Sequence, residues 1–176
     1  MLHLARRYVR SFRPGNAPSV DLAWARGLLK PEILALFDRL PVFDQRHGVE
    51  SARAAQQALI ELGTEDPGPF IVAALVHDVG KFDAHLGPTR RAFATVVGSI
   101  AGRSRTAAWA MRTQGWRARV GRYIEHDVIG AQALAAVGAP SVAVQWAATH
   151  HATPATWETL GLPPGVVDAL DAADYA

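Results

Sequence analysis

One short segment joins two metal-binding side chain types directly. His77 and Asp78 follow the apolar run Ala73–Val76 and precede Val-Gly-Lys81. Burying an imidazole and a carboxylate together at the end of an apolar helix is costly unless something pairs with both. A metal ion is the usual partner, because it binds the nitrogen and the oxygen at once. The segment therefore predicts a metal site.

Further histidines and aspartates lie on other apolar, small-residue-rich segments. They are His47, His126, the adjacent pair His150 and His151, and, near the carboxyl end, Asp171 and Asp174. Taken alone, each is most simply a hydrogen-bonded core residue or a surface residue. The chain has no cysteine, so a metal would have to be held by histidine, aspartate and glutamate.

The segments that must position these groups are all predicted to be helical. Apolar residues recur at helical spacing, and no strand-like alternation persists for more than a few residues. We expect Asp21 to cap the first helix, Pro31 to begin the second and Gly63 to follow the long third. The predicted helices cover about residues 21–30, 31–40, 44–62, 70–79, 89–101, 105–112, 117–124, 127–137, 140–150 and 164–175.

The length of 176 residues suits one domain with a substantial core. We expect residues 1–40 to form a basic arm with accessory helices, and residues 41–176 to form an all-α bundle. The run 128–157 has no charged Asp, Glu, Lys or Arg and is long enough to cross a bilayer. Gly138–Pro140 divides it and polar side chains interrupt it, so we expect two buried helices and a cytoplasmic protein without a signal peptide.

The order of these residues resembles the signature of the HD-domain superfamily. The resemblance rests on His47 after Arg46 in a long helix, on the run His-Asp-Val-Gly-Lys from His77, and on a late Asp174 in Ala-Ala-Asp. It covers about residues 40 to 176. Two additional histidines lie between the central pair and the last aspartate. They resemble those of the HD-domain proteins that have a two-metal site. The resemblance implies a helical bundle with the metal site at its centre.

The resemblance also implies a ligand set. One divalent ion would be held by His47, His77, Asp78 and Asp174, and a second by Asp78, His126 and His150. His151 stays open as the alternative to His150, and Asp171 as the alternative to Asp174. One or two ions are expected, with iron or manganese favoured and cobalt, nickel, magnesium or zinc also compatible. Such a pair can bind a hydroxide nucleophile and neutralise charge on a phosphoryl group.

A basic stretch follows the central motif. Residues 84–124 contain eight arginines and no Asp or Glu, although the net charge of the whole chain is only +2. Lys81 could place its ammonium on a phosphate oxygen or simply offset a helix C-terminus. We expect Lys81, Arg90, Arg91 and Arg117 to bind substrate phosphate, and Asp78 and Lys81 to be catalytic. The alternatives for the arginines are a solvated face or an anionic membrane surface; no nucleic-acid motif is present.

The function expected from these features is hydrolysis of a phosphate ester or anhydride of a small molecule, with a nucleotide as the favoured class. The segment after His151 lacks the Gly-Tyr-Pro element of cyclic-dinucleotide phosphodiesterases, and Asp78 is not followed by the Glu-Asp of stringent-response hydrolases. The alternatives are a mixed-valent diiron oxygenase of HD type and a non-catalytic module that binds a partner or a membrane. The oligomeric state stays open.

Overall fold

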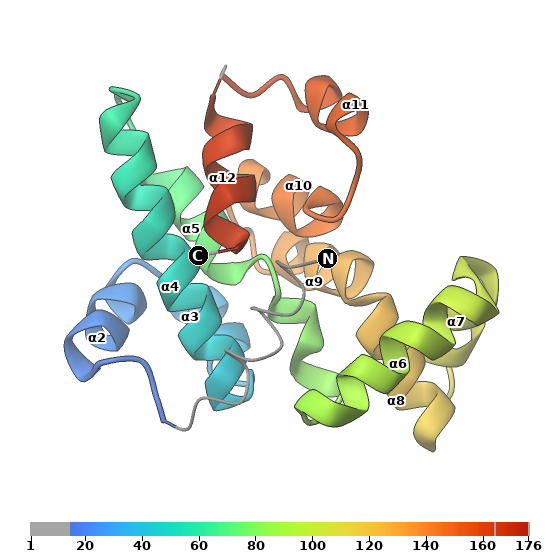
Figure 1. Ribbon diagram of the computed structural model, residues 1–176. Helices are drawn as coiled ribbons and strands as arrows, with labels where there is room; N and C mark the ends of the chain where they lie inside the picture. The colour runs from blue at the N-terminus through green and yellow to red at the C-terminus, as the bar shows by residue number, and fades with distance from the viewer. Residues whose placement is uncertain (1–14, 164, 176) are drawn as a thin grey trace.

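The computed structural model describes residues 15–163 and 165–175, and all regular structure in these residues is helical (Figure 1). The predicted all-α class is therefore confirmed, while the basic part of the arm in residues 1–14 lies outside the described residues. The α-helices are α2 (Ser19–Gly27), α3 (Pro31–Phe37), α4 (Val42–Glu61), α5 (Gly68–Val76), α6 (Pro88–Ala101), α7 (Arg103–Ala110), α8 (Trp116–Ile124), α9 (His126–Ala136), α10 (Ser141–Thr149), α11 (Pro154–Trp157) and α12 (Val166–Asp174). Two 3-10 helices, η1 (Val79–Asp83) and η2 (Glu158–Leu160), complete the set.

Two of the three residues predicted to mark the ends of helices do so. Pro31 begins α3, and Gly63 follows α4 with a positive φ of 69°, which glycine adopts without strain. The expectation that Asp21 caps α2 is wrong. Pro18 occupies the capping position, and Asp21 lies in the first turn, where its carboxylate is 2.7 Å from Nη2 of Arg53 on α4.

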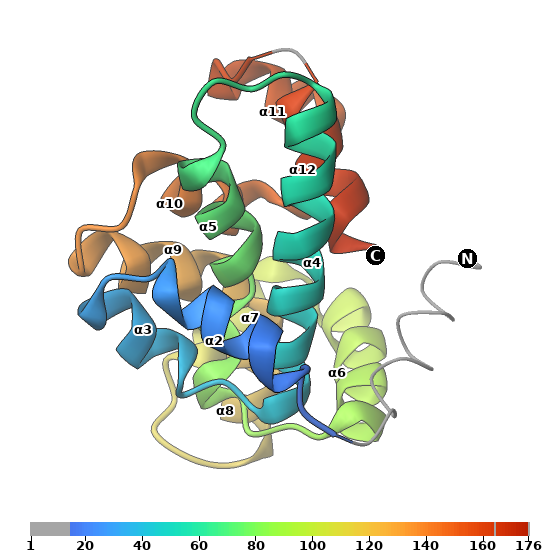
Figure 2. The same ribbon diagram turned by 90° about the vertical axis from the view of Figure 1, so that its left-hand side faces the viewer.

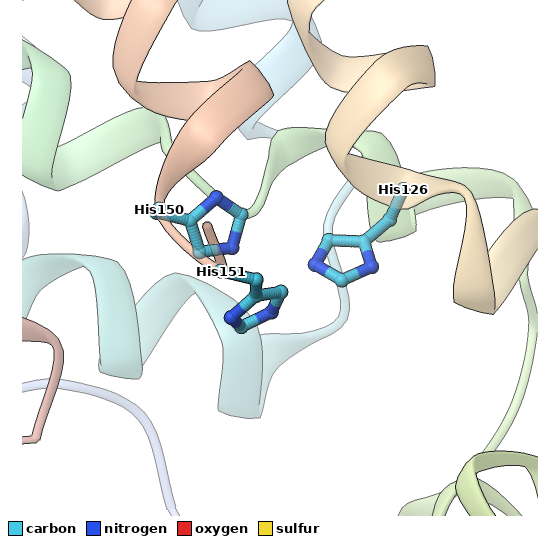
Figure 3. A group of neighbouring side chains, drawn as sticks. All are labelled: His126, His150 and His151. Carbon is cyan, nitrogen blue, oxygen red and sulfur yellow. The ribbon is translucent and has the colours of Figure 1, made fainter. Parts of the chain in front are cut away.

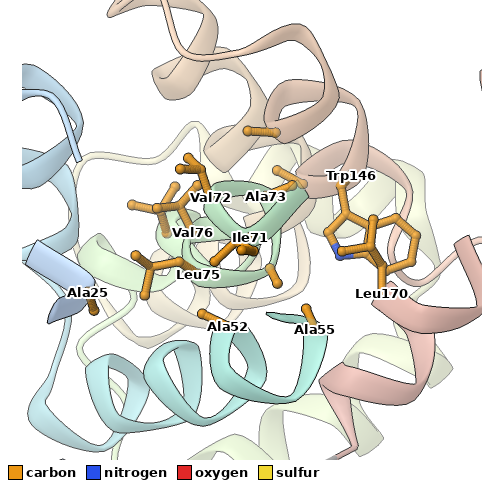
Figure 4. Packing of buried hydrophobic residues seen from close by; sticks show 14 of the residues in the cluster. Ala25, Ala52, Ala55, Ile71, Val72, Ala73, Leu75, Val76, Trp146 and Leu170 are labelled. Carbon is orange, nitrogen blue, oxygen red and sulfur yellow. The ribbon is translucent and has the colours of Figure 1, made fainter. Parts of the chain in front are cut away.

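Helix α5 lies at the centre of the main core, as its composition predicts. All residues of Ile71–Val76 are buried, so this helix has no polar face. Figure 4 shows residues of α4, α10 and α12, among them Ala52, Trp146 and Leu170, packed around it. Burial of apolar surface stabilises a protein by about 25 cal/mol for each Å², so this helix contributes to the stability of the bundle along its whole buried length.

Helices α4 and α5 pass very close to one another. A Cβ atom added at Gly48 would lie 2.4 Å from the carbonyl oxygen of Leu75, so only glycine allows this approach. The close approach brings His47 on α4 beside His77 at the end of α5, with ring centroids 5.3 Å apart.

Residues 128–157 contain two main helices, as predicted, but each is buried along one face only, and Val128 is 40% exposed. Helices α9 and α10 are separated by a turn in which Gly138 has a positive φ of 66°, and both contribute buried residues such as Leu134 and Trp146. Among residues 15–163 and 165–175, no helix is long and apolar enough to cross a membrane.

Helices α6, α7 and α8 lie together at one end of the molecule (Figure 1). They have a small core of their own, formed by Leu86, Ala94 and Val120. In contrast, the helices of residues 19–37 share the main core through residues such as Ile33 and Phe37, and Figure 2 shows α2 and α3 beside α4 and α5. The accessory helices expected before residue 40 are thus packed on the bundle.

Two features were not expected from the sequence. The chain after Asp78 continues as the 3-10 helix η1, where a loop or helix end was predicted, and residues 154–160 form the short helices α11 and η2. Helix α11 brings Trp157 onto α10, where the indole Nε1 donates a hydrogen bond of 2.7 Å to the carbonyl of Thr149. This bond satisfies one carbonyl in the last turn of α10.

Candidate metal centre

The candidate metal centre is built at helix ends. His77 and Asp78 follow α5, His150 follows α10, and Asp174 is the last residue of α12. The carboxyl end of a helix carries partial negative charge, so three such ends facing one region favour a cation there. His126, the first residue of α9, and His47, in the second turn of α4, complete the centre.

The first donor group surrounds Asp174. Its Oδ1 lies 3.0 Å from Nε2 of His47 and 3.0 Å from Nε2 of His77. The donor atoms of His47, His77 and Asp78 lie within 4.8 Å of one another, a spacing that could hold a metal ion. Asp174 is only 3% exposed, whereas Asp171 is partly exposed one turn earlier, so the structure brings Asp174 to the centre.

The second donor group consists of three histidines. Nε2 of His126 lies 3.1 Å from Oδ1 of Asp78, and Nε2 of His150 lies 3.5 Å from the same oxygen. Donor atoms of His126, His150 and His151 lie within 4.8 Å of one another and could hold a second ion; Figure 3 shows their rings gathered around one space. The sequence leaves His150 and His151 as alternatives, whereas the structure brings both together.

The backbone fixes three of the imidazole rings. Each Nδ1 faces a carbonyl oxygen three residues earlier: Ala74 for His77 at 2.8 Å, Tyr123 for His126 at 2.7 Å and Ala147 for His150 at 3.0 Å. These carbonyls belong to last helical turns, where no backbone donor follows. With Nδ1–H donated to the carbonyl, each ring presents the lone pair of Nε2, as a metal ligand must.

The Nε2 atoms that face the centre need a partner. Those of His77, His126 and His150 are completely buried, and none makes a hydrogen bond of acceptable geometry with the described residues. An unsatisfied polar atom in the interior costs about 1–3 kcal/mol. Three such atoms converging on carboxylates fit a divalent metal, because nitrogen and carboxylate oxygen are ligands that iron, manganese and zinc share.

A buried lysine supplies positive charge beside the centre. The ammonium of Lys81 forms an ion pair with Oδ2 of Asp78, and both side chains are buried. Burial alone would raise the pKa of Asp78, but the charges of Lys81 and His77 hold that pKa well below its usual value. Asp78 is therefore ionised and suited to metal binding.

Burial also sets the charge of the histidines. Desolvation, reinforced by the ammonium of Lys81, lowers the pKa of His126 to about 4. Desolvation and the neighbouring His150 and His126 lower the pKa of His151. The pKa of His77 is raised, because the carboxylates of Asp78 and Asp174 outweigh its desolvation. His126 and His151 are thus neutral at physiological pH, the form that binds metals.

The arginines expected to bind substrate occupy three different places. Arg91 is buried and forms a bidentate ion pair with Asp44, with N–O distances of 2.7 and 2.6 Å, so its guanidinium is engaged inside the protein. Arg90 lines a hollow between α6 and α8, and Arg117 lies 5.7 Å from the ring centroid of Trp116. Among the described residues, neither Arg90 nor Arg117 contacts the histidines of the centre through an ion pair or hydrogen bond.

Comparison of the chain with protein-family models, with curated proteins and with solved structures found no match. The function is therefore inferred from the residues of the centre itself. Two donor groups could each hold an ion, Asp78 belongs to the first and faces two histidines of the second, and a buried ammonium lies beside this carboxylate.

Proposed function

We propose that the protein is a metal-dependent phosphohydrolase of HD type, acting on a small phosphorylated molecule such as a nucleotide. The observation that carries this proposal is the convergence of His77, His126 and His150 on Asp78 through buried Nε2 atoms. These residues occur in the order that resembles the HD signature, and the structure surrounds them with the other residues of that resemblance.

In this proposal the two donor groups would hold two divalent ions, and both groups would use the carboxylate of Asp78. Its Oδ2 faces His77 and His47, at 3.6 and 3.9 Å, and its Oδ1 faces His126 and His150. Asp174 completes the first group and His151 the second. When bound, the ions would neutralise charge on a phosphoryl group and lower the pKa of a water nucleophile.

The charge balance of the centre supports an anionic substrate. Two buried carboxylates, Asp78 and Asp174, stand against the single ammonium of Lys81. Two divalent ions would therefore leave the centre with an excess of three positive charges. Such an excess in a buried site attracts a phosphate group more strongly than a neutral substrate.

Lys81 and His151 have separate roles in this account. Lys81 keeps Asp78 ionised and fixes its orientation through the buried ion pair, which makes it a positioning residue. His151 is exposed, and its ring centroid lies 3.9 Å from that of His150, so it stands on the solvent side of the second donor group. Substrate would therefore approach past His151.

The proposal is tested with protein purified without oxygen or chelator and supplied with Mn²⁺ or Fe²⁺. Phosphate release is measured over a panel of nucleoside mono-, di- and triphosphates, dinucleoside polyphosphates and sugar phosphates. We expect at least one to be hydrolysed, and His77→Ala to abolish the reaction. The control is His85→Asn, since His85 is an exposed histidine outside the centre whose positive φ of 48° asparagine tolerates.

The experiment must also distinguish the phosphohydrolase from the alternative function, a diiron oxygenase. Its ligands would be the same side chains, so oxygen consumption is recorded with the iron-loaded protein on the same panel. Oxygen uptake that depends on His77, without phosphate release from any compound, would contradict the phosphohydrolase. Absence of both activities from the metal-loaded protein would remove the support for catalysis.

A further inference from the structure

The outer side of α6 is apolar. Phe93, Val96 and Ile100 are 61%, 57% and 79% exposed, and their spacing places them on one face of the helix. The opposite side carries the buried residues Arg91 and Ala94. A surface helix normally directs its apolar stripe inward. Here large apolar side chains also point outward, which indicates a surface that binds something.

This apolar stripe continues onto α8. Phe93 and Trp116 line a hollow of about 280 Å³ together with Arg90 and Arg119, and Leu86 and Val120 also line it. Trp116 is 55% exposed. The α6–α8 face is defined here by four residues that line the hollow and two that follow Phe93 on the same side of α6: Arg90, Phe93, Trp116 and Arg119, with Val96 and Ile100.

The α6–α8 face is positively charged. Residues 84–124 contain no Asp or Glu. Arg90 and Arg119 are exposed, and neither forms an ion pair with a carboxylate in the part of the chain that the structure describes. Carboxylates at the borders of this stretch are already engaged: Asp83 by Arg39 at 3.0 Å, and Asp127 by Arg103 at 3.0 Å. The positive charges of Arg90 and Arg119 are therefore not paired with any carboxylate of the described residues.

We propose that the α6–α8 face binds the surface of an anionic phospholipid membrane. Exposed aliphatic side chains, a tryptophan and arginines on one surface match the boundary of such a membrane, where the apolar groups enter the lipid and the arginines meet phosphates. A second copy of the chain fits poorly, since a symmetric contact would bring Arg90 and Arg119 against their own copies. A nucleic acid would leave Val96 and Ile100 without an apolar partner.

The proposal is tested by flotation of the full chain with vesicles of phosphatidylcholine alone and of phosphatidylcholine with 40% phosphatidylglycerol. We expect binding only to the anionic vesicles and weaker binding at high salt. Arg90→Gln with Arg119→Gln is expected to lower the partition coefficient about twenty-fivefold, at about fivefold for each arginine. Phe93→Ser with Ile100→Ser is expected to lower it at least tenfold. Metal content and thermal melting verify that each variant is folded.

The matched control is Ile60→Ser with Lys30→Gln, because Ile60 is 60% exposed and Lys30 is an exposed cation, both outside the α6–α8 face. This variant should float like the unaltered protein. Failure of the unaltered protein to float with anionic vesicles at low salt would overturn the proposal. So would equal losses in the control and the face variants, or a dimer in solution that Phe93→Ser with Ile100→Ser dissociates, which would assign the face to a second copy.

Discussion

Oδ1 of Asp78 lies 3.1 Å from Nε2 of His126, while Oδ2 of the same carboxylate is paired with Lys81. One buried carboxylate thus belongs to the first donor group and lies against the second. Since Asp78 is a member of the first group and its Oδ1 faces two histidines of the second, we predict that changing a histidine of one group removes one ion, whereas changing Asp78 removes both.

Replacing His126 by alanine is expected to remove one ion. His126→Ala eliminates a donor of the second group, while His47, His77 and Asp174 stay in place. Metal content per chain, measured by mass spectrometry on protein purified without oxygen, should fall from about two to about one. His85→Asn should keep both ions. Loss of both ions from His126→Ala would mean that the two groups do not bind independently.

Lys81 should matter most when metal is absent. Lys81→Met removes the ammonium paired with Asp78, and breaking a buried ion pair costs about 3–5 kcal/mol. Divalent ions can take over the role of the ammonium, so the loss of stability should shrink when the protein is saturated with Mn²⁺. Thermal melting with and without metal measures this difference, with exposed Lys30→Met as the control. An equal loss in both conditions would contradict the electrostatic role of Lys81.

Gly80 permits the contact between η1 and α9. A Cβ atom there would lie 2.0 Å from the carbonyl oxygen of His126 and 2.5 Å from the backbone nitrogen of Gly130. Gly80→Ala should therefore push α9 away, destabilise the protein by about 1–3 kcal/mol and weaken the second metal site. Gly87→Ala is the control, because nothing lies within 4 Å of its Cβ position. Unfolding curves and metal titration should separate the two variants, and identical behaviour would contradict the packing argument.

The buried pair of Asp44 and Arg91 fastens α6 to the beginning of α4. Asp44→Asn leaves the buried guanidinium of Arg91 without its counter-charge, so a loss of about 3–5 kcal/mol in the free energy of unfolding is expected. The control is Asp83→Asn, whose ion pair with Arg39 is exposed and should contribute about 0–1 kcal/mol. Chemical denaturation measures both. A small loss for Asp44→Asn would show that the pair is not what holds α6.

Much of the fold could be predicted because the apolar pattern is strong. The long α4, the wholly apolar α5 and the division of residues 128–157 by Gly138 all follow from local sequence. His77 and Asp78 at the end of an apolar helix likewise predict a metal site from local sequence alone. Asp21 misled the prediction, since a good capping residue one turn inside a helix can instead form an ion pair with Arg53.

Contacts between residues far apart in the sequence determine the features that local sequence does not predict. Arg91 resembles its exposed neighbour Arg90 in sequence, and only the fold places Asp44 against it. Likewise, His150 and His151 both belong to the second donor group because the turn after α10 directs both rings toward His126. Three histidines share one local pattern: Nδ1 of His77, of His126 and of His150 each faces the carbonyl oxygen of the residue three positions earlier. This pattern is typical of a histidine at or just after the end of a helix.

The central claim is that two groups of donors around Asp78 hold two metal ions, and metal content per chain tests it most directly. The protein is purified without oxygen or chelator, supplied with Fe²⁺ or Mn²⁺, freed of unbound ions and measured by mass spectrometry beside Asp78→Asn and Asp171→Asn. We predict about two ions for the unaltered protein and for Asp171→Asn, and essentially none for Asp78→Asn. Less than one ion in the unaltered protein, or the same content in all three, would contradict the account.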